Sequence, residues 1–426
     1  MSSVSFLEKL LDGVGVEWKA LGSLGELVRG NGLQKKDFTE TGVPAIHYGQ
    51  IYTYYGLSTT ETKSFVSPDL AKQLKKVDKG DVVITNTSEN LEDVGKALVY
   101  LGERQAVTGG HATILKPGKC LLGKYFAYFT QTDEFASEKR KYAKGTKVID
   151  VSATDMAKIK LPIPCPDNPK KSLEIQAEIV RILDAFTALT AELTAELTAE
   201  LNTRKKQYNY YRDRLLSFEE GEVEWKTLFE ACDYVDYRGK TPTKTSNGVF
   251  LVTAKNIRMG YIDYQASQEF ISKDDYSLVM RRGLPKIGDV LITTEAPCGF
   301  VAQIDRENIA LAQRVIKYRS KYSNLSNSFL KHYLLGTQFQ DKLLQAATGS
   351  TVKGIKGSKL HQLTIPIPSI AEQARIVAIL DKFNALTNSI TEGLPREIAL
   401  RQKQHEYYRD MLLNFPKPAD PTPTAA

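Results

Sequence analysis

Residues 179–190 read IVRILDAFTALT, and residues 376–387 read IVAILDKFNALT. A second pair of matching stretches follows, RKKQYNYYRDRLLSF at 204–218 and RQKQHEYYRDMLLNF at 401–415. The members of each pair lie 197 residues apart (376 − 179 and 401 − 204), so the intervening chain has kept its length. The sequence therefore contains an internal repeat, and this repeat determines the fold.

Two shorter motifs repeat in the same order around these stretches. VEWK occurs at 16–19 and 223–226, and Pro-Ile-Pro occurs at 162–164 and 366–368. The segments between the motifs, roughly 21–160 and 228–364, differ in sequence. The chain therefore alternates a variable domain with a shared helix, twice. Because one repeat is split between the two chain ends, we expect the termini to lie close together.

The shared segments are predicted to be long helices because their apolar residues recur at steps of three and four. The expected inter-helix seam consists of Leu183, Phe186, Leu189, Leu193, Leu197, Leu201, Leu380, Phe383, Leu386, Ile390, Leu394 and Ile398. Matching apolar stripes favour antiparallel packing of the two helices. Residues 190–201 repeat TAEL three times and are interpreted as a helical spacer. Gly393 and Pro395 predict a kink near 393–395.

The predicted fold class is mixed α/β, with two globular α/β domains separated by an antiparallel pair of long helices in a pseudo-twofold repeat. GDVVIT at 80–85 and GDVLIT at 288–293 are expected to be buried strands. The predicted segments are an N-terminal piece completing the split repeat (1–20), a first variable domain (21–164), a central spacer helix (165–218), a second variable domain (219–368), a C-terminal spacer helix (369–415) and a flexible tail (416–426).

The composition is that of a soluble globular protein, with 42% hydrophobic and 25% charged residues in 426. No apolar run approaches the roughly 18 residues of a membrane helix, and residues 1–12 lack a signal-peptide core, so a cytoplasmic location without membrane contact is expected. Four scattered cysteines argue against a disulfide framework and a zinc site. The net charge of +7 permits a polyanionic partner without requiring one.

Polar and aromatic side chains in the variable domains are candidates for contact with double-stranded DNA. Asn and Gln suit adenine, and Arg suits guanine. The base-reading candidates are His47, Tyr48, Gln50, Tyr52, Lys255, Asn256 and Arg258. Tyr48 and Tyr52 could equally be core or cross-strand residues. Cations in loops suit phosphates, which position a protein without reading sequence. The phosphate candidates are Lys35, Lys36, Lys144, Lys147, Arg238, Lys240, Lys353 and Lys356.

No catalytic constellation can be argued from the sequence. The phosphate-loop pattern G-x-x-x-x-G-K-[ST] is absent, as is an Asn-Pro-Pro-Tyr-like methyltransferase motif. Glu17-x-Lys19 and Glu224-x-Lys226 have the spacing of some metal nucleases, but they flank a tryptophan at domain joints and are interpreted as packing residues. We therefore expect no catalytic residue, metal or cofactor in this chain.

The order of elements, the Pro-Ile-Pro motifs, the GDV(V/L)IT strands and the TAEL repeats resemble type I restriction–modification specificity subunits. The resemblance covers essentially the whole chain. It is specific in the shared helices and generic in the variable domains. TAELTAELTAELN, RKKQYNYYRD and ITEGLPREI resemble the type IC subfamily in particular.

This resemblance implies that each variable domain is a target-recognition domain reading one half of a split, asymmetric DNA site. It implies that the helices dock two methyltransferase (M) subunits, which methylate adenine N6 with S-adenosylmethionine, and that restriction (R) subunits cleave with ATP and Mg²⁺. These ligands belong to the partners. The candidate M-docking residues on the helices are Tyr208, Tyr210, Tyr211, Tyr407 and Tyr408.

The resemblance also implies that the number of TAEL copies tracks the unread gap. Half-sites read from one face have centres about one turn apart, which leaves a gap of roughly six to eight base pairs. Two alternatives stay open: a stand-alone DNA-binding regulator, and a nuclease. Co-purification with a methyltransferase distinguishes a specificity subunit from a stand-alone regulator. Incubation of the pure chain with DNA and Mg²⁺ tests for a nuclease, which would cleave the DNA.

Overall fold

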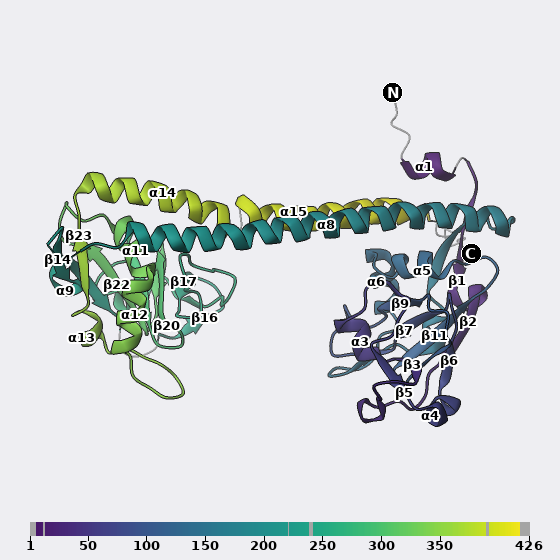
Figure 1. Cartoon of the computed structure of the whole chain (residues 1–426). Coiled ribbons are helices and arrows are strands. Elements are labelled where there is room, and N and C mark those ends of the chain that lie inside the picture. The colour runs from purple at the N-terminus through teal and green to yellow at the C-terminus, as the bar shows by residue number, and fades with distance from the viewer. Residues whose placement is uncertain (1–5, 12, 220, 238–241, 389–391, 418–426) are drawn as a thin grey trace. The chain divides into compact units, whose positions relative to one another are not determined.

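The structure is a computed structural model that describes residues 6–11, 13–219, 221–237, 242–388 and 392–417 (Figure 1). The chain divides into two compact units. Unit 1 comprises residues 1–194 and 400–426, and unit 2 comprises residues 195–399. The two divisions fall inside helices α8 (Pro169–Leu215) and α15 (Gly393–Leu413), so each unit contains one globular domain and part of both helical segments.

Unit 1 contains two main sheets. The described strands of the larger sheet are ordered β2 (Gly25–Arg29), β11 (Ala112–Pro117), β7 (Val82–Thr85), β9 (Ala97–Tyr100) and β4 (Ser58–Thr59). Those of the smaller sheet are ordered β5 (Ser64–Val66), β3 (Val43–Ile46), β10 (Ala106–Thr108) and β6 (Lys75–Val77). Strand β7 is buried at every position, as its continuous apolar run predicts. Helices α5 (Gly123–Phe129) and α6 (Asp133–Arg140) supply further core residues, including Phe126, Phe129 and Phe135.

Unit 2 repeats this plan. One sheet is ordered β15 (Cys232–Asp236), β22 (Val315–Ser320), β19 (Val290–Thr294) and β20 (Cys298–Gln303). The other is ordered β16 (Lys244–Thr245), β18 (Phe270–Ile271), β17 (Val249–Val252) and β21 (Ile309–Leu311). Helices α11 (Asn327–Leu335) and α12 (Thr337–Ala346) correspond to α5 and α6 of unit 1. Both GDV(V/L)IT motifs therefore form the buried strands that the sequence predicts.

The two short repeated motifs pair with each other in both units. Strand β1 (Val16–Ala20) runs antiparallel to β13 (Lys160–Pro164), and β14 (Glu224–Thr227) runs antiparallel to β23 (Thr364–Ile367). The register is the same, because Trp18 lies opposite Pro162 and Trp225 lies opposite Pro366. The Glu-x-Lys residues of these strands form ion pairs of 3.0 Å in unit 1 and 3.2 Å in unit 2.

The C-terminal helical segment is interrupted near the place that the sequence predicts. Helix α14 spans Ile370–Asn388 and α15 begins at Gly393. Gly393 has a φ of +74°, and a Cβ on it would lie 2.5 Å from the Ala385 carbonyl oxygen. Only glycine fits this left-handed, crowded position.

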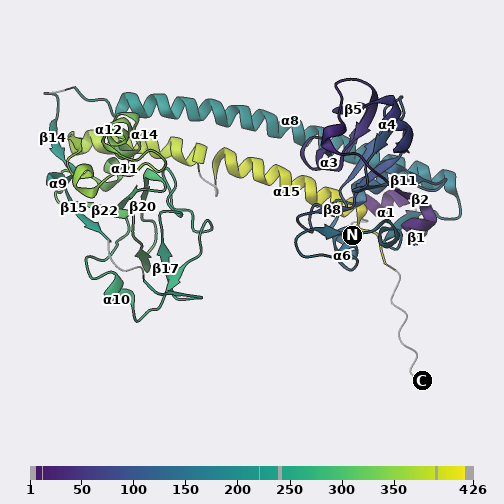
Figure 2. The same ribbon diagram turned by 90° about the horizontal axis from the view of Figure 1, so that it is seen from below.

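Within each unit, α8 packs against the returning helical segment (Figure 2). In unit 1 the Phe186 ring stacks on Tyr408 of α15, with centroids 5.5 Å apart and planes 8° apart. In unit 2 the Phe383 ring of α14 stacks on Tyr211 of α8 at 5.8 Å and 26°. Phe383 and Tyr408 are the repeat equivalents of Phe186 and Tyr211 (383 − 186 = 408 − 211 = 197), so the same stack forms twice.

Most of the predicted seam residues are buried or partly buried. Leu183 and Leu380 are fully buried, and those in partial contact are Phe186, Leu193, Leu197, Leu201, Phe383, Leu386, Leu394 and Ile398. Leu189 is 51% exposed. A step of four from Phe186 places Thr190 on the seam face, which is why Leu189 points away from it. Ile390 lies outside the described residues.

The described parts of the two chain ends pack into one core in unit 1. Leu7 and Leu11 of α1 (Phe6–Leu11) share a cluster with Leu412 and Leu413. The Trp18 indole Nε1 donates a hydrogen bond of 2.9 Å to the carbonyl of Pro416. The ends therefore meet, as a repeat split between them requires. Of the predicted tail, only Pro416 and Lys417 are described, and the Lys417 ammonium pairs with Glu134 at 2.8 Å.

Cysteines, possible metal ligands and helix hydropathy bear on function. Cys120, Cys165, Cys232 and Cys298 are free thiols, and only Cys232 is buried. No group of His, Cys, Asp and Glu among the described residues could hold a metal ion. None of the described helices is both long and apolar enough to cross a membrane.

Candidate nucleic-acid interface

The two units share a backbone arrangement where the buried central strand ends. In unit 1 the Asn86 N–H donates to the His111 carbonyl, and the Val151 N–H donates to the Asn86 carbonyl, both at 2.9 Å. In unit 2 the Thr294 N–H donates to the Arg314 carbonyl at 2.8 Å, and the Ile355 N–H donates to the Thr294 carbonyl at 2.9 Å. We call each set of three residues a strand-end frame: Asn86, His111 and Val151, and Thr294, Arg314 and Ile355.

Each strand-end frame carries a polar side-chain pair. In unit 1 the Thr87 Oγ1 lies 3.0 Å from the His111 Nδ1, and His111 is exposed. In unit 2 the Arg314 Nε lies 2.6 Å from the Glu295 Oε1, and their side chains are 57% and 42% exposed. The sequence prediction missed all four residues. One signal was available, since Thr87 and Glu295 each lie seven positions after the glycine of their GDV(V/L)IT motif.

The predicted base-reading segment of unit 1 forms the end of β3 and helix α3 (Tyr48–Thr53). His47 is the N-cap of this helix, and its Nδ1 accepts a hydrogen bond of 3.1 Å from the Gly49 N–H. Burial, followed by the positive charge of Lys35, lowers the pKa of His47, which keeps the ring neutral. His47 therefore supports the helix.

Tyr48 lies beside the strand-end frame. Its partly exposed ring is 4.8 Å from the His111 ring and 4.5 Å from that of His47. The Tyr52 hydroxyl donates a hydrogen bond of 2.6 Å to the Thr87 carbonyl, and burial raises the pKa of Tyr52 to about 12. Tyr52 thus braces the segment that carries Thr87, whereas Tyr48 presents an aromatic edge next to His111.

Gln50 is also engaged within unit 1. Its Nε2 donates a hydrogen bond of 2.6 Å to the Ser64 Oγ. Its Oε1 is buried, with no hydrogen-bond partner among the described residues. This arrangement leaves the Gln50 amide facing the protein interior.

In the corresponding segment of unit 2, one of the three base-reading candidates is buried and two are accessible. Asn256 is fully buried, and its Oδ1 accepts hydrogen bonds of 2.9 Å from the Thr253 N–H and hydroxyl. Its Nδ2 donates to the carbonyls of Asp263 and Ser267. The amide holds the turn together and has no edge left for a base in this conformation. Lys255 is exposed, and partly exposed Arg258 lies 3.4 Å from Asp263.

The loops near the strand-end frames share one conformation. Gly145 and Gly349 have φ angles of +104° and +115°, and a Cβ on either would lie 2.0 or 2.1 Å from the carbonyl oxygen of Val148 or Val352. Both valines are exposed, at 58% and 57%. Glycine is thus required at the same place in both units. We call these segments the glycine loops, residues 144–150 and 348–354.

The phosphate candidates that the structure describes lie at the surface. Lys147 and Lys353 are exposed on the glycine loops, and Lys356 is exposed just after the second loop. Exposed Lys144 pairs with Asp155 at 3.1 Å, and hydrogen bonds from Lys158 and Lys144 hold the pKa of Asp155 far below its usual range. Lys35 and Lys36 are exposed on the short 3-10 helix Lys35–Asp37. Arg238 and Lys240 lie outside the described residues.

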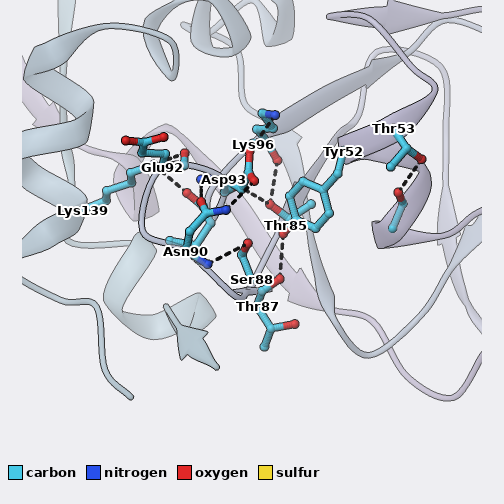
Figure 3. Close-up of polar contacts among 12 residues, drawn as sticks. Tyr52, Thr53, Thr85, Thr87, Ser88, Asn90, Glu92, Asp93, Lys96 and Lys139 are labelled. Carbon is cyan, nitrogen blue, oxygen red and sulfur yellow. Dashed lines mark hydrogen bonds and ion pairs between the residues drawn. The ribbon is translucent and has the colours of Figure 1, made fainter. Parts of the chain in front are cut away.

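In unit 1 a polar network orders the chain between Ser88 and Lys96 (Figure 3). The Asp93 N–H donates to the Asn90 Oδ1 at 2.8 Å. The buried Lys139 ammonium donates to the carbonyls of Glu92 and Val94 at 2.8 and 2.7 Å. Burial lowers the pKa of Lys139 to about 8. Lys139 therefore supports a neighbouring loop, although it belongs to a basic stretch of the sequence.

In unit 2 the strand-end frame and the glycine loop border a polar pocket of about 530 Å³. Its lining includes Thr294, Glu295, Arg314, Val352 and Lys356. An exposed guanidinium, a carboxylate and an ammonium therefore face one hollow. This combination suits the edge of a base and its phosphate.

The tyrosines predicted to dock an M subunit differ in accessibility. Tyr208 is 7% exposed and lies in the core of unit 2. Tyr211 and Tyr408 stack on the phenylalanines of the seam. Tyr210 and Tyr407 are 59% and 66% exposed. The last two are repeat equivalents (407 − 210 = 197), so each unit presents the same exposed aromatic ring.

Comparison with known families accounts for this duplicated architecture. The family model described as "Type I restriction modification DNA specificity domain" matches the chain twice, at residues 14–203 and 222–400. The chain belongs to this family. A type I specificity subunit is the non-catalytic DNA-recognition component of its restriction–modification system, and this chain is such a subunit.

Relatives with reviewed descriptions agree along their full length. The chain is 39% identical to the EcoR124I/EcoR124II specificity subunit of Escherichia coli, over 98% of this chain and 99% of the relative. It is 34% identical to the EcoprrI specificity subunit of Escherichia coli, over 92% and 93% of the two chains. These similarities support the specificity-subunit interpretation, and nothing in them favours a stand-alone regulator.

Solved structures share the fold of this specificity subunit. A chain from a study of complex assembly and conformational transition of the type I system matches with a TM-score of 0.62 at 17% identity, covering 94% of this chain and 97% of the other. The HsdS subunit of Thermoanaerobacter tengcongensis matches with a TM-score of 0.52 at 17% identity, covering 94% and 96%. The predicted fold class of two α/β domains with long connecting helices is confirmed.

Proposed function

We propose that this specificity subunit reads a bipartite, asymmetric DNA target, with one half-site for each unit and an unread gap of roughly six to eight base pairs. The observation that carries the proposal is the duplicated strand-end frame, which presents different polar side chains in the two units. One frame with two sets of side chains suits two half-sites of different sequence.

Within each half-site, the exposed residues divide by chemistry. Tyr48, Lys255 and Arg258 are proposed to lie near base edges, because their side chains remain at least partly accessible. The phosphate contacts are proposed for the exposed lysines Lys35, Lys36, Lys144, Lys147, Lys353 and Lys356. We leave His47, Gln50, Tyr52 and Asn256 out of the interface, because hydrogen bonds within their units already engage them.

The helices are proposed to dock two copies of an M subunit. A partner that binds twice needs the same surface twice, and the exposed rings of Tyr210 and Tyr407 supply an equivalent aromatic anchor in each unit. The complex would then be an adenine-N6 methyltransferase that uses S-adenosylmethionine. Added R subunits would supply ATP-dependent, Mg²⁺-dependent cleavage. All of these ligands would bind the partners.

The TAEL repeats are proposed to set the spacing of the half-sites, as in the type IC subfamily that the sequence resembles. Four helical residues add about 6 Å and about 400°, a net advance of about 40°. One DNA base pair advances about 34–36°. One repeat therefore compensates the rotation of about one base pair, although its rise exceeds the 3.4 Å of that step.

Methylation mapping tests the proposed function. The chain is co-expressed with its M subunit, and methylated adenines are located across the genome. A single split, asymmetric motif with a gap of roughly six to eight base pairs is expected. A pure chain that binds DNA specifically as a monomer, without associating with the M subunit, would indicate a regulator. Cleavage of DNA by the pure chain with Mg²⁺ would indicate a nuclease.

Deleting one repeat, residues 190–193, tests the spacer. The gap in the methylated motif should shorten, while both half-sites keep their sequence. The matched control is Glu192→Gln with Glu196→Gln, two exposed positions whose substitution keeps the helix length and should leave the gap unchanged. An unaltered gap after the deletion would refute the role of the repeats as a spacer.

A further inference from the structure

The two units can serve as an alignment of two related sequences, because their shared elements supply equivalent positions. At one such position a buried glutamine holds main chain in both units. Gln176 and Gln373 are both fully buried and equivalent (373 − 176 = 197). Gln176 accepts from the Leu122 N–H at 2.9 Å, and Gln373 accepts from the equivalent Ser326 N–H at 2.8 Å.

The strand-end frames show the opposite relation. Their main-chain hydrogen bonds match within 0.1 Å, yet the paired side chains are Thr87 and His111 in one unit and Glu295 and Arg314 in the other. Besides the main-chain bonds, the Asn86 Nδ2 donates to the Val151 carbonyl and the Thr294 hydroxyl donates to the Arg314 carbonyl, so the frame forms without the side chains of either pair. The residue type changes at one place in a constant frame where His111 and Arg314 are exposed, which indicates that their side chains serve recognition, with buried Thr87 supporting His111.

The backbone of unit 2 supports this interpretation. Arg314 has a φ of +68°, and Ala296, next to Glu295, has a φ of +47°. Residues other than glycine seldom adopt this conformation, and such outliers cluster at binding sites. Arg314 is one member of a guanidinium–carboxylate pair, and Ala296 follows the other member, Glu295. Both members are accessible at the polar pocket. The carboxylate of Glu295, 2.6 Å away, fixes the orientation of the planar guanidinium.

We infer that Thr87 with His111 and Glu295 with Arg314 are the specificity-determining pairs of the two half-sites, and that Arg314 contacts a guanine. An arginine held by a carboxylate can donate two hydrogen bonds to guanine O6 and N7 in the major groove. The pair in unit 1 has no such bidentate donor and reads a different base. The Tyr48 ring, 4.8 Å from the His111 ring, would border that base on one side. The inference rests on the proposed function, because it assigns residues to half-site reading.

The test exchanges the pairs in the assembled complex. Glu295→Thr with Arg314→His places the pair of unit 1 in unit 2, and Thr87→Glu with His111→Arg makes the reciprocal exchange. Each variant is co-expressed with the M subunit, and the methylated motif is mapped. Each exchange should change one or two bases of one half-site. The other half-site and the gap should stay as in the wild type.

A binding measurement separates base reading from phosphate contact. Arg314→Lys removes the bidentate geometry and keeps the charge. Its complex should bind the wild-type duplex about tenfold or more weakly, with less discrimination at the guanine and an unchanged salt slope. Equal weakening on all duplexes, with discrimination at the guanine unchanged, would assign Arg314 to a phosphate and overturn the inference.

The control is Glu372→Thr with Arg375→His, which makes the same substitutions in an ion pair of 2.6 Å on helix α14. It should leave the motif intact. If an exchange abolishes methylation, the methylated motif is mapped for the single variants Arg314→Lys and Glu295→Gln. A half-site that tolerates more bases supports the inference, and an unaltered motif overturns it. The wild-type map separates the two levels, since absence of a bipartite motif there contradicts the proposed function itself.

Discussion

Units 1 and 2 anchor the same helix positions in two different ways. The Asp184 carboxylate of unit 1 accepts hydrogen bonds from the Tyr128 hydroxyl at 2.7 Å and the Lys124 ammonium at 2.8 Å. Its equivalent in unit 2, Asp381, lies 2.7 Å from the His332 Nε2 and 3.2 Å from the Lys331 ammonium. Eight residues earlier on each helix, Gln176 and Gln373 make the same main-chain contacts in both units.

The difference shows which contacts constrain the sequence. The glutamine side chain both accepts from and donates to main-chain groups that lie at the same place in both units, so its shape is kept. A side chain that meets another side chain can change together with its partner. The repeat therefore retains its glutamines and varies the partners of its aspartates.

The largest expected effect concerns the seam. Leu183→Ala and Leu380→Ala each remove a fully buried side chain at equivalent positions (380 − 183 = 197). Each should lower the free energy of unfolding of its unit by about 2–5 kcal/mol, the range for such cavities. Urea unfolding followed by circular dichroism measures the change.

The control for the seam is Leu189→Ala, which is 51% exposed and should change stability by less than about 0.5 kcal/mol. Losses that differ severalfold between Leu183→Ala and Leu380→Ala would mean that the two helix contacts are not equivalent.

A smaller effect is expected when the buried glutamines lose their hydrogen bonds. Gln176→Leu leaves the Leu122 N–H without its acceptor, and Gln373→Leu does the same to the Ser326 N–H. Each variant should lose about 1–3 kcal/mol, the cost of an unsatisfied buried group. Urea unfolding reports the loss, and exposed Gln402→Leu is the control. A neutral result at either glutamine would contradict its anchoring role.

The aromatic stacks should distinguish the units. Phe383 lies 6.3 Å from Tyr208 and 5.8 Å from Tyr211, whereas Phe186 stacks on Tyr408 alone, because His405 takes the place of Tyr208 (405 − 208 = 197). Phe186→Leu should cost about 0.5–1.5 kcal/mol beyond the area lost, and Phe383→Leu should cost more. Thermal unfolding compares them, with Tyr407→Leu as an exposed control. The reverse order would contradict the ring geometry.

The smallest expected effect is the pH dependence that His332 contributes to the stability of unit 2. Burial lowers the pKa of His332 below its ordinary value of 6.5, despite the hydrogen bond with Asp381. As the pH falls below 6.5, the unfolded chain binds a proton more readily than the folded one, so stability is present above 6.5 and lost on acidification. The hydrogen bond from His332 lowers the pKa of Asp381 to about 2, so this carboxylate contributes only at more acid pH.

His332→Tyr, which introduces the residue of unit 1, should therefore reduce the fall in melting temperature between about pH 7.5 and about pH 5.5 by up to a few degrees. The control is His111→Tyr, an exposed ring outside the helix contact. Equal acid sensitivity of the wild type and His332→Tyr would exclude His332 as its source.

The periodic features of the molecule could be predicted from the sequence. Constant spacing of 197 residues gave the duplication, apolar steps of three and four gave the helices, and the GDV(V/L)IT runs gave the buried strands. Leu189 was the exception, because a sequence pattern cannot distinguish a step of three from a step of four where both positions could face the partner.

The candidate interface was predicted less completely. Exposed Lys147 and Lys353 and partly exposed Tyr48 lie near the strand-end frames, and their contact with DNA stays a prediction. The amide of Asn256 suits adenine and predicts base reading, but hydrogen bonds within unit 2 engage all its polar groups. The sequence does not predict His111 and Arg314 as contact residues, since no local pattern surrounds them. They lie beside Thr87 and Glu295 only because two strands distant in sequence pair.

The sequence by itself determined that this protein is a duplicated, two-headed binding chain joined by long helices, because repeats and periodicity are local properties that survive without coordinates. Only the tertiary structure decided which polar side chains are accessible to a partner and which form hydrogen bonds within the protein. That choice depends on hydrogen bonds between residues far apart in the chain, such as Thr87 with His111 and Glu295 with Arg314, and no sequence spacing encodes it.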